Sequence, residues 1–306
     1  MSNFDLHKKW VQRYAERINQ PPQNPPNTLP PAFVGAPDPA QQPQIPVSTP
    51  FLQEDFFFLD GAFGESIDKR IHEKYASIPA MDSVVYNSQE KKIKGSNPFY
   101  VVAVNEVFQE RYPNEEIRTA TQAELEQIVR NNPSVLKGTY EDSSLVWRSS
   151  AEPNEYLATK IYNQLKSTGK ILEENHAYVL PLYAVSLEKD TNAPQSLAFK
   201  ARGNSTFFPN VYFEAPILMS TSGKYISDAD FDFTQGLPTK VFDSTQSILI
   251  PNRQLYTLVG GLSRFYLGSY LYVSADDDNL AGSDDGGRVV LVSGAATTQK
   301  NPGATP

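Results

Sequence analysis

Cysteine is absent from the 306 residues of this chain. Its absence excludes disulfide bonds, zinc sites with thiolate ligands and catalysis by a thiol. The sequence also has no run that approaches the ~18 consecutive apolar residues of a membrane-spanning helix. Charged residues interrupt the apolar positions near the N-terminus, so we expect no signal peptide. The chain is therefore predicted to be soluble. Its compartment is not encoded in any pattern, and a virion or a cytoplasmic particle is compatible with these features.

Basic residues are fewer than acidic residues in this chain. There are 27 Lys and Arg against 35 Asp and Glu, which gives a formal net charge of −8 at pH 7. Proteins that bind nucleic acid normally present a clustered basic surface, so we predict no nucleic-acid partner. The hydrophobic share of 40% is nevertheless large enough to build a core. We therefore expect a globular protein after the N-terminal fifty residues.

Proline is concentrated in residues 21–50, which hold eleven of the 24 prolines and a single charged residue, Asp38. This composition favours an extended polyproline conformation, and such a segment is a semi-rigid tether. In the preceding residues 1–20, apolar side chains recur at helical spacing while most charged side chains fall elsewhere around the helix. The predicted partner-binding residues of this amphipathic helix are Phe4, Trp10, Val11, Tyr14 and Ile18.

A helix of about four turns is only marginally stable by itself in water, so this one must pack against something. It can fold back on its own domain, dock on a partner subunit or lie on a membrane surface. Four basic and two acidic residues give it a weak positive charge for the membrane role. We favour docking on a neighbouring subunit, because the tether can carry the helix tens of ångströms from the body.

Residues 51–170 are predicted to be a mixed α/β region. Thr121 and Glu124 have the spacing of a capping box, which marks the start of a helix. Pro153 is predicted to lie in the first turn of a second helix. Gly169 is predicted to end that helix in the left-handed backbone conformation. The other elements that we expect are a first strand in the aromatic cluster at 51–59, a helix at 66–76, and strands at 84–86, 99–104 and 145–147.

Residues 171–296 are predicted to be mainly β, and residues 297–306 a polar tail. Short apolar segments alternate here with Pro, Gly, Asn and Asp clusters, which is typical of an antiparallel sandwich. Pro181 interrupts the run at 178–187 and indicates an edge strand or a bulge there. Further strands are expected at 196–200, 211–214, 217–219, 240–242, 247–250 and 289–292. The predicted fold class is therefore α+β.

The clearest strand pattern lies at residues 264–273. Side chains alternate across a strand, so one face is apolar and the other carries a row of tyrosines beside an arginine. Such a row is a sugar platform, a protein-binding hot spot or a second buried interface. The residues of this possible ligand face are Arg264, Tyr266, Tyr270 and Tyr272.

An acid-rich loop follows that strand. Calcium prefers several oxygen ligands on a flexible loop, so this segment is the best metal candidate in the sequence. Its spacing does not match an EF-hand, and simple solvation is the alternative interpretation. The candidate ligands are Asp276, Asp277, Asp278, Asp284 and Asp285. No other cofactor is predicted.

The tether and the amphipathic helix indicate attachment more strongly than any residue pattern indicates catalysis. We therefore expect a non-enzymatic structural or accessory component of a large assembly, oligomeric, with protein subunits as partners. A viral or phage-type particle is the preferred setting by architectural analogy. The alternative is a carbohydrate-binding or glycoside-hydrolysing protein that uses the tyrosine-rich face and carboxylates.

Overall fold

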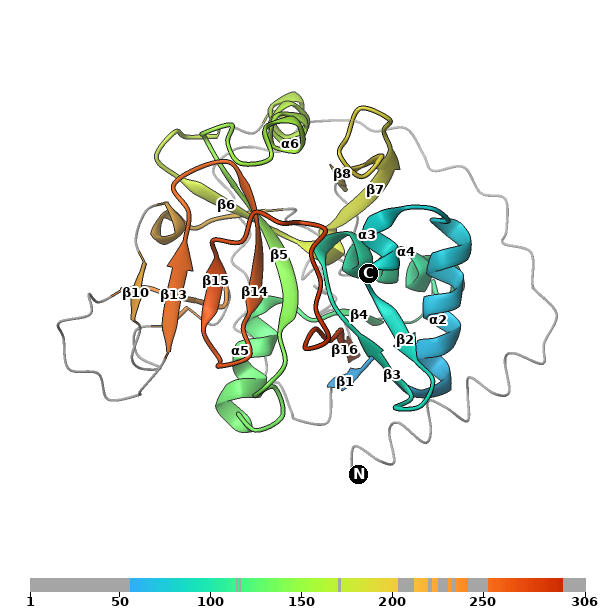
Figure 1. Cartoon of the computed structure of the whole chain (residues 1–306). Helices are drawn as coiled ribbons and strands as arrows, with labels where there is room; N and C mark the ends of the chain where they lie inside the picture. The colour runs from blue at the N-terminus through green and yellow to red at the C-terminus, as the bar shows by residue number, and fades with distance from the viewer. Residues whose placement is uncertain are drawn as a thin grey trace, which may run out of the picture. The chain divides into compact units, whose positions relative to one another are not determined.

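The structure is a computed structural model of the chain (Figure 1). It describes residues 56–113, 115, 117–169, 172–202, 212–219, 222–224, 231–232, 235–241 and 253–293. These residues belong to one compact unit. The predicted docking helix, the proline-rich tether and the polar tail lie outside the described residues. Among the described helices, none is long and apolar enough to cross a membrane.

The α-helices of the described part all lie before residue 170. They are α2 (Gly61–Lys74), α3 (Pro79–Asp82), α4 (Pro98–Arg111), α5 (Gln122–Asn131) and α6 (Glu155–Ser167). After residue 170 the described helical segments are two short 3-10 turns, η1 (Leu182–Ala184) and η2 (Pro216–Leu218).

A seven-stranded sheet forms the centre of the fold (Figure 1). Its order is β10 (Gly223–Lys224), β13 (Gln254–Thr257), β15 (Val273–Ala275), β14 (Leu262–Leu267), β5 (Glu141–Arg148), β6 (Ala177–Pro181) and β9 (Phe213–Glu214). All neighbours are antiparallel except β13 and β15. β5 pairs with β14 and β6, so strands from the predicted α/β and β-rich regions share one sheet.

Four smaller sheets contain the remaining described strands. β1 (Phe56–Phe58), β16 (Val290–Ser293) and β4 (Ile117–Thr119) form a three-stranded antiparallel sheet. Three two-stranded ribbons are β2 (Val85–Asn87) with β3 (Lys92–Lys94), β7 (Val185–Lys189) with β8 (Leu197–Ala201), and β11 (Phe231–Asp232) with β12 (Leu237–Pro238). The α+β class is confirmed. The packing of two sheets into a sandwich stays a prediction.

The strand predicted at 99–104 is wrong, because this segment lies inside α4. Pro98 occupies the first turn, and the side chain of Asn97 caps the helix by accepting a hydrogen bond from the Tyr100 amide at 2.9 Å. Residues 98–108 are all buried, so the apolar residues surround the helix instead of forming one stripe. A continuous apolar run does not distinguish a buried helix from a buried strand. The cap and the proline were the signals that favoured a helix.

The helices predicted from their end signals are present. Thr121 and Glu124 form both hydrogen bonds of the capping box at the start of α5. Gly169 has a φ of +77°, as predicted for a residue after the end of α6. Pro153, however, precedes the N-cap residue Asn154 and is not in the first turn. That part of the prediction is wrong, because the chain turns once more at Asn154, which has a φ of +62°, before the helix begins.

The apolar run at 178–187 is divided at Pro181 into β6, η1 and β7. β6 is not an edge strand, since it pairs with β5 and, at Tyr178 and Val179, with β9. Pro181 is the last residue of β6 and pairs with Ser144 of β5. The strand predicted at 217–219 is wrong, since Pro216 begins a 3-10 turn there. The predicted strand at 289–292 is confirmed as β16. Of the strand predicted at 240–242, residues 240 and 241 belong to no strand and residue 242 lies outside the described residues, as does the whole strand predicted at 247–250.

Candidate functional site

The predicted continuous strand at 264–273 is wrong, because a turn breaks it. β14 ends at Leu267, β15 begins at Val273, and the two pair antiparallel. In the turn, Leu271 has a φ of +62° and its amide donates to the Gly268 carbonyl at 2.7 Å. The alternation of apolar residues and tyrosines continues through this reversal, so the pattern alone concealed it. Gly268 was the local signal for a turn.

The turn separates the four residues of the possible ligand face. Arg264 is buried on β14, Tyr266 is half-buried on the same strand, and Tyr270 is 75% exposed in the turn. Tyr272 precedes β15, yet its ring meets that of Tyr266 at a centroid distance of 6.2 Å. The Arg264 guanidinium lies 5.1 Å from the centre of the Tyr266 ring. The structure therefore brings three of the four together and leaves Tyr270 mostly in solvent.

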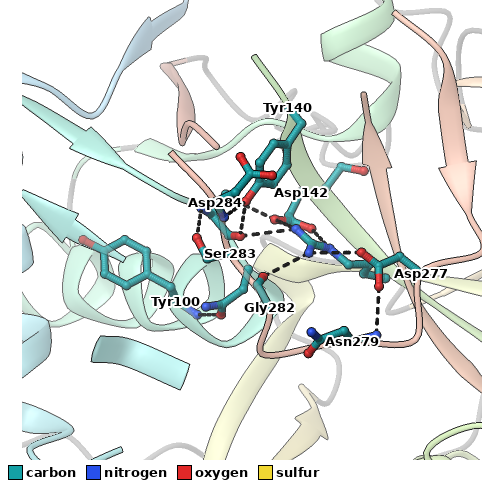
Figure 2. A network of polar contacts seen from close by, with 12 residues as sticks. Tyr100, Tyr140, Asp142, Asp277, Asn279, Gly282, Ser283 and Asp284 are labelled. Atoms are coloured by element: carbon teal, nitrogen blue, oxygen red, sulfur yellow. Dashed lines mark hydrogen bonds and ion pairs between the residues drawn. The ribbon is translucent and has the colours of Figure 1, made fainter. Parts of the chain in front are cut away.

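Asp142 on β5 is the main partner of Arg264 (Figure 2). The Arg264 Nε donates to Oδ1 at 2.7 Å, and Nη2 donates to Oδ2 at 2.6 Å. This is the bidentate geometry that makes arginine–carboxylate pairs strong. The two side chains are only 5% and 0% exposed. Burial acts against the charged guanidinium, but the attraction of Asp142 more than offsets it and holds the pKa of Arg264 above its ordinary value.

The remaining donors of Arg264 hold the acid-rich loop. Its Nη1 donates to the Gly282 carbonyl at 3.0 Å and to Asp277 Oδ2 at 3.3 Å. Its Nη2 also donates to the Ser96 carbonyl at 3.2 Å. The Arg264 amide donates to the Asp277 carbonyl at 2.9 Å. One buried guanidinium therefore connects β14, β5, the start of α4 and the loop.

Ser96 and Tyr140 complete this network, which we call the Arg264 clamp (Figure 2). The Ser96 hydroxyl donates to Asp142 Oδ2 at 2.6 Å, and its amide donates to the Ser283 hydroxyl at 3.0 Å. The Tyr140 hydroxyl donates to the Ser96 carbonyl and accepts from the Asp284 amide, both at 3.0 Å. The clamp satisfies its buried polar groups internally, as buried networks must.

The five candidate metal ligands do not converge. Asp277 bonds Arg264, Asp276 accepts from the Ser274 hydroxyl, and Asp284 Oδ1 accepts from the Gly286 amide at 2.7 Å. The remaining candidates, Asp278 and Asp285, are exposed. Within the part of the chain that the structure describes, no group of three or more His, Cys, Asp or Glu side chains is placed to hold a metal ion. The calcium site stays a prediction.

A second arginine, Arg148 on β5, is completely buried, and its hydrogen-bond partners among the described residues are carbonyl and hydroxyl oxygens. Its Nε donates to the Leu218 carbonyl at 2.8 Å, Nη1 to the Ser263 hydroxyl at 2.9 Å, and Nη2 to the Thr257 hydroxyl and the Ala275 carbonyl at 2.7 and 3.0 Å. Burial lowers the pKa of Arg148 to about 10, so the side chain keeps its charge at neutral pH. It ties η2, β13, β14 and β15 to β5.

Glu141, beside Asp142 on β5, is a buried carboxyl group of a different kind. It is 1% exposed, and one oxygen accepts from the Thr139 hydroxyl. Among the described residues its Oε2 has no hydrogen-bond partner. Burial raises the pKa of Glu141 to about 8, although the Thr139 hydrogen bond acts in the opposite direction. The side chain is therefore mostly protonated at pH 7.

The predicted partner-binding residues Phe4, Trp10, Val11, Tyr14 and Ile18 lie outside the described residues. Comparison with protein-family models, curated proteins and solved structures returns no match to this chain.

Sequence reasoning named Arg264 and the loop aspartates but missed Asp142, Ser96, Tyr140, Arg148 and Glu141. One signal was present: Glu141, Asp142 and Arg148 occupy a strand whose centre is strongly apolar. Charged residues in a buried strand require partners, and the arginine of the tyrosine-rich strand was a natural candidate. The arrangement as a whole is a structural clamp that fixes a loop and a sheet.

Proposed function

We propose that this protein is a non-enzymatic structural or accessory component of a large assembly, and that residues 1–20 dock on a neighbouring subunit at the end of the tether formed by residues 21–50. A viral or phage-type particle is the setting that we prefer. The observation that carries this proposal is the sequence order: an amphipathic segment, then eleven prolines within thirty residues, then the compact unit. A short amphipathic helix on a stiff tether stabilises an assembly by packing on another surface.

The described body supports a scaffold role. Three of its buried charged side chains join elements: Arg264 pairs with Asp142, and Arg148 donates to four carbonyl or hydroxyl oxygens. Large exposed hydrophobic side chains of the described surface are few and scattered, namely Val85, Tyr156, Val259 and Tyr270. The apolar positions of residues 1–20 are therefore the contacts on which this proposal relies.

The test compares the full chain with a Trp10→Ser, Tyr14→Ser double variant. Size-exclusion chromatography with light scattering measures the mass of the assembled species. We expect the variant to lose the assembled species while the thermal unfolding of the body is unchanged. Gln12→Ser with Gln20→Ser is the matched control, because it alters polar positions of the same segment. If the double variant keeps the assembled mass of the full chain, the proposal is wrong.

A second candidate function is carbohydrate binding or glycoside hydrolysis. The meeting of the Tyr266 and Tyr272 rings at 6.2 Å, with Tyr256 at 5.4 Å from Tyr272, favours it. Aromatic side chains with hydroxyl groups are suitable partners for a sugar. A glycan array decides this candidate: binding that is lost in Tyr272→Ala supports it, and no signal from the intact protein removes it.

A further inference from the structure

Four tyrosine rings form a continuous row across the seven-stranded sheet. Tyr256 meets Tyr272 at a centroid distance of 5.4 Å, Tyr272 meets Tyr266 at 6.2 Å, and Tyr266 meets Tyr140 at 6.0 Å, with every contact edge-to-face. Tyr256 and Tyr266 both lie opposite Ser274 of β15, which places them on one side of the sheet. Tyr140 is buried, whereas the other three are half-buried. We call Tyr256, Tyr266 and Tyr272 the tyrosine face.

The tyrosine face is held rigidly. A Cβ on Gly268 would lie 2.2 Å from Cζ of Tyr272. The Tyr272 ring therefore packs directly against Gly268, and a larger residue at position 268 would clash with it. The Arg264 guanidinium lies over the rings of both Tyr266 and Tyr140, at 5.1 and 5.2 Å from their centres. A surface whose rotamers are fixed before binding loses little conformational entropy on contact. The face is therefore preorganised for a ligand that accepts flat, apolar contacts and hydroxyl hydrogen bonds.

Acidic side chains border this face. Asp276 and Asp278 follow β15 directly and are exposed, as are Asp284 and Asp285 further along the loop, while Arg264 holds Asp277 in place. Of the 27 basic and 35 acidic residues, 23 and 32 lie beyond residue 50, so that part of the chain carries a net charge of −9. The surroundings of the tyrosine face therefore favour a ligand whose flank is basic.

The first fifty residues of the chain have this chemistry. Polyproline segments present flat pyrrolidine rings and unpaired carbonyls, and they bind characteristically in aromatic-lined surfaces whose hydroxyl or indole groups donate to those carbonyls. Residues 21–50 supply eleven prolines, and the adjoining residues 1–20 supply four basic side chains, Lys8, Lys9, Arg13 and Arg17. Thirty residues of polyproline conformation span about 90 Å.

We propose that the tyrosine face binds the proline-rich segment 21–50 of a second copy of this chain, with the basic residues of segment 1–20 beside the acid-rich loop. This inference rests on the proposed function and names the partner and the receiving surface. Because every copy carries one arm and one tyrosine face, each copy both gives and receives a contact. Such head-to-tail pairing produces rings or open filaments, depending on whether the rotation between copies closes.

Photo-crosslinking of the full chain tests the contact. Tyr270 borders the face and is 75% exposed, so it accepts replacement by p-benzoylphenylalanine. Chains that carry this group are mixed with ¹⁵N-labelled chains, irradiated and analysed by mass spectrometry. We expect crosslinks from position 270 to peptides of residues 21–50 that bear the label. The control places the same group at Val85, which is 56% exposed on β2, and should give no such peptide.

The outcomes separate this inference from the proposed function. Crosslinks only within one chain, or none to residues 21–50, overturn the inference. If the Trp10→Ser, Tyr14→Ser variant still loses its assembled mass in that case, the docking role stands and the tyrosine face is excluded as its receiver. If crosslinks to residues 21–50 are absent and the Trp10→Ser, Tyr14→Ser variant also keeps its assembled mass, both proposals fail.

Affinity provides a second readout. Truncation of an aromatic anchor in an interface typically weakens binding about tenfold or more. We expect Tyr256→Ser to raise the dissociation constant of the self-associated species about tenfold in a sedimentation series, and Tyr156→Ser, on α6, to leave it within about twofold. Equal effects of the two substitutions overturn the inference. Circular dichroism melting confirms that both variants are folded.

Discussion

Arg264 and Asp142 join β14 to β5 through two parallel hydrogen bonds of 2.7 and 2.6 Å, and neither side chain is more than 5% exposed. They lie 122 residues apart in the sequence. The pair fixes the centre of the seven-stranded sheet and, through the other donors of Arg264, also anchors the acid-rich loop.

Replacement of one partner should leave the other charge uncompensated in the core. We predict that Arg264→Met lowers the free energy of unfolding by about 3–5 kcal/mol. Urea denaturation monitored by tryptophan fluorescence measures the loss. Arg70→Met is the control, because Arg70 pairs with Glu73 at 3.5 Å with 41% and 50% of the side chains exposed, and the loss there should stay below about 1 kcal/mol. Equal losses in the two variants would show that the clamp contributes no more than a surface pair.

Glu141 should make stability depend on pH. Its pKa is about 8 in the folded protein, against about 4.3 in the unfolded chain. An acid whose pKa rises on folding favours the folded state fully below the unfolded value, and this contribution is lost as pH rises towards the folded value. We therefore predict that the free energy of unfolding of Glu141→Gln, relative to that of the natural chain, increases between pH 5 and pH 8. The difference reaches roughly a few kcal/mol at pH 8.

The measurement for Glu141 is a set of denaturation curves at pH 5, 6, 7 and 8 for both proteins. Glu155→Gln, at an exposed position of α6, provides the matched control, and its free energy of unfolding should change with pH as that of the natural chain does. If the free energy of Glu141→Gln also follows that of the natural chain from pH 5 to pH 8, the predicted protonation of Glu141 is wrong.

Gly287 should tolerate no side chain. A Cβ there would lie 2.3 Å from the Ser96 amide nitrogen and 2.5 Å from the Gly95 carbonyl carbon, and backbone atoms cannot move aside cheaply. We predict that Gly287→Ala costs roughly 2–4 kcal/mol of unfolding free energy. At the neighbouring Gly286 the nearest atom is the flexible Asp284 Oδ1 at 3.0 Å, so Gly286→Ala should cost clearly less. The reverse order in thermal melts would refute the contact between the loop and residues 95–96.

Asn97 should stabilise α4 in two ways. Its side-chain oxygen accepts from the Tyr100 amide at 2.9 Å, and its side-chain amide group donates to the Ala80 carbonyl at 2.7 Å. We predict a loss of about 1–2 kcal/mol for Asn97→Ala, because the cap is lost and the Ala80 carbonyl loses one of its donors while it keeps the Ser83 hydroxyl at 2.9 Å. The substitution Asn97→Ser keeps an oxygen that can cap the helix, removes the amide donor and adds no charge, so it serves as the comparison. A loss for Asn97→Ala that is no larger than the loss for Asn97→Ser in chemical denaturation would argue against the cap.

Local signals led to correct predictions wherever the physical cause is itself local. The capping box of Thr121 and Glu124 needs only a spacing of three residues, and both of its hydrogen bonds form. Gly169 follows α6 with a positive φ because a left-handed residue after a helix favours glycine. The apolar run that becomes β16 was also predicted correctly, because it is short, rich in valine and preceded by glycines, which favours a strand over a helix.

Predictions failed where burial on every side erased the periodic pattern or where a turn left it intact. Residues 99–104 were expected to be a strand, but α4 is surrounded by the core and therefore shows no polar face. The tyrosine-rich segment was expected to be one strand, but the turn between Gly268 and Tyr272 reverses the chain without interrupting its alternation. In both cases a local signal was present, namely Pro98 after the capping Asn97 and Gly268 in the turn, but the hydrophobic pattern outweighed it.

The sequence by itself determined the composition of the parts: a proline-rich segment beside an amphipathic one, helices with their end signals, and a β-rich second half in an α+β body. Only the tertiary structure decided which charges meet. The pairing of Arg264 with Asp142 and the meeting of Tyr256 with Tyr272 depend on the strand order β13-β15-β14-β5, because strand pairing brings together side chains that no sequence spacing relates.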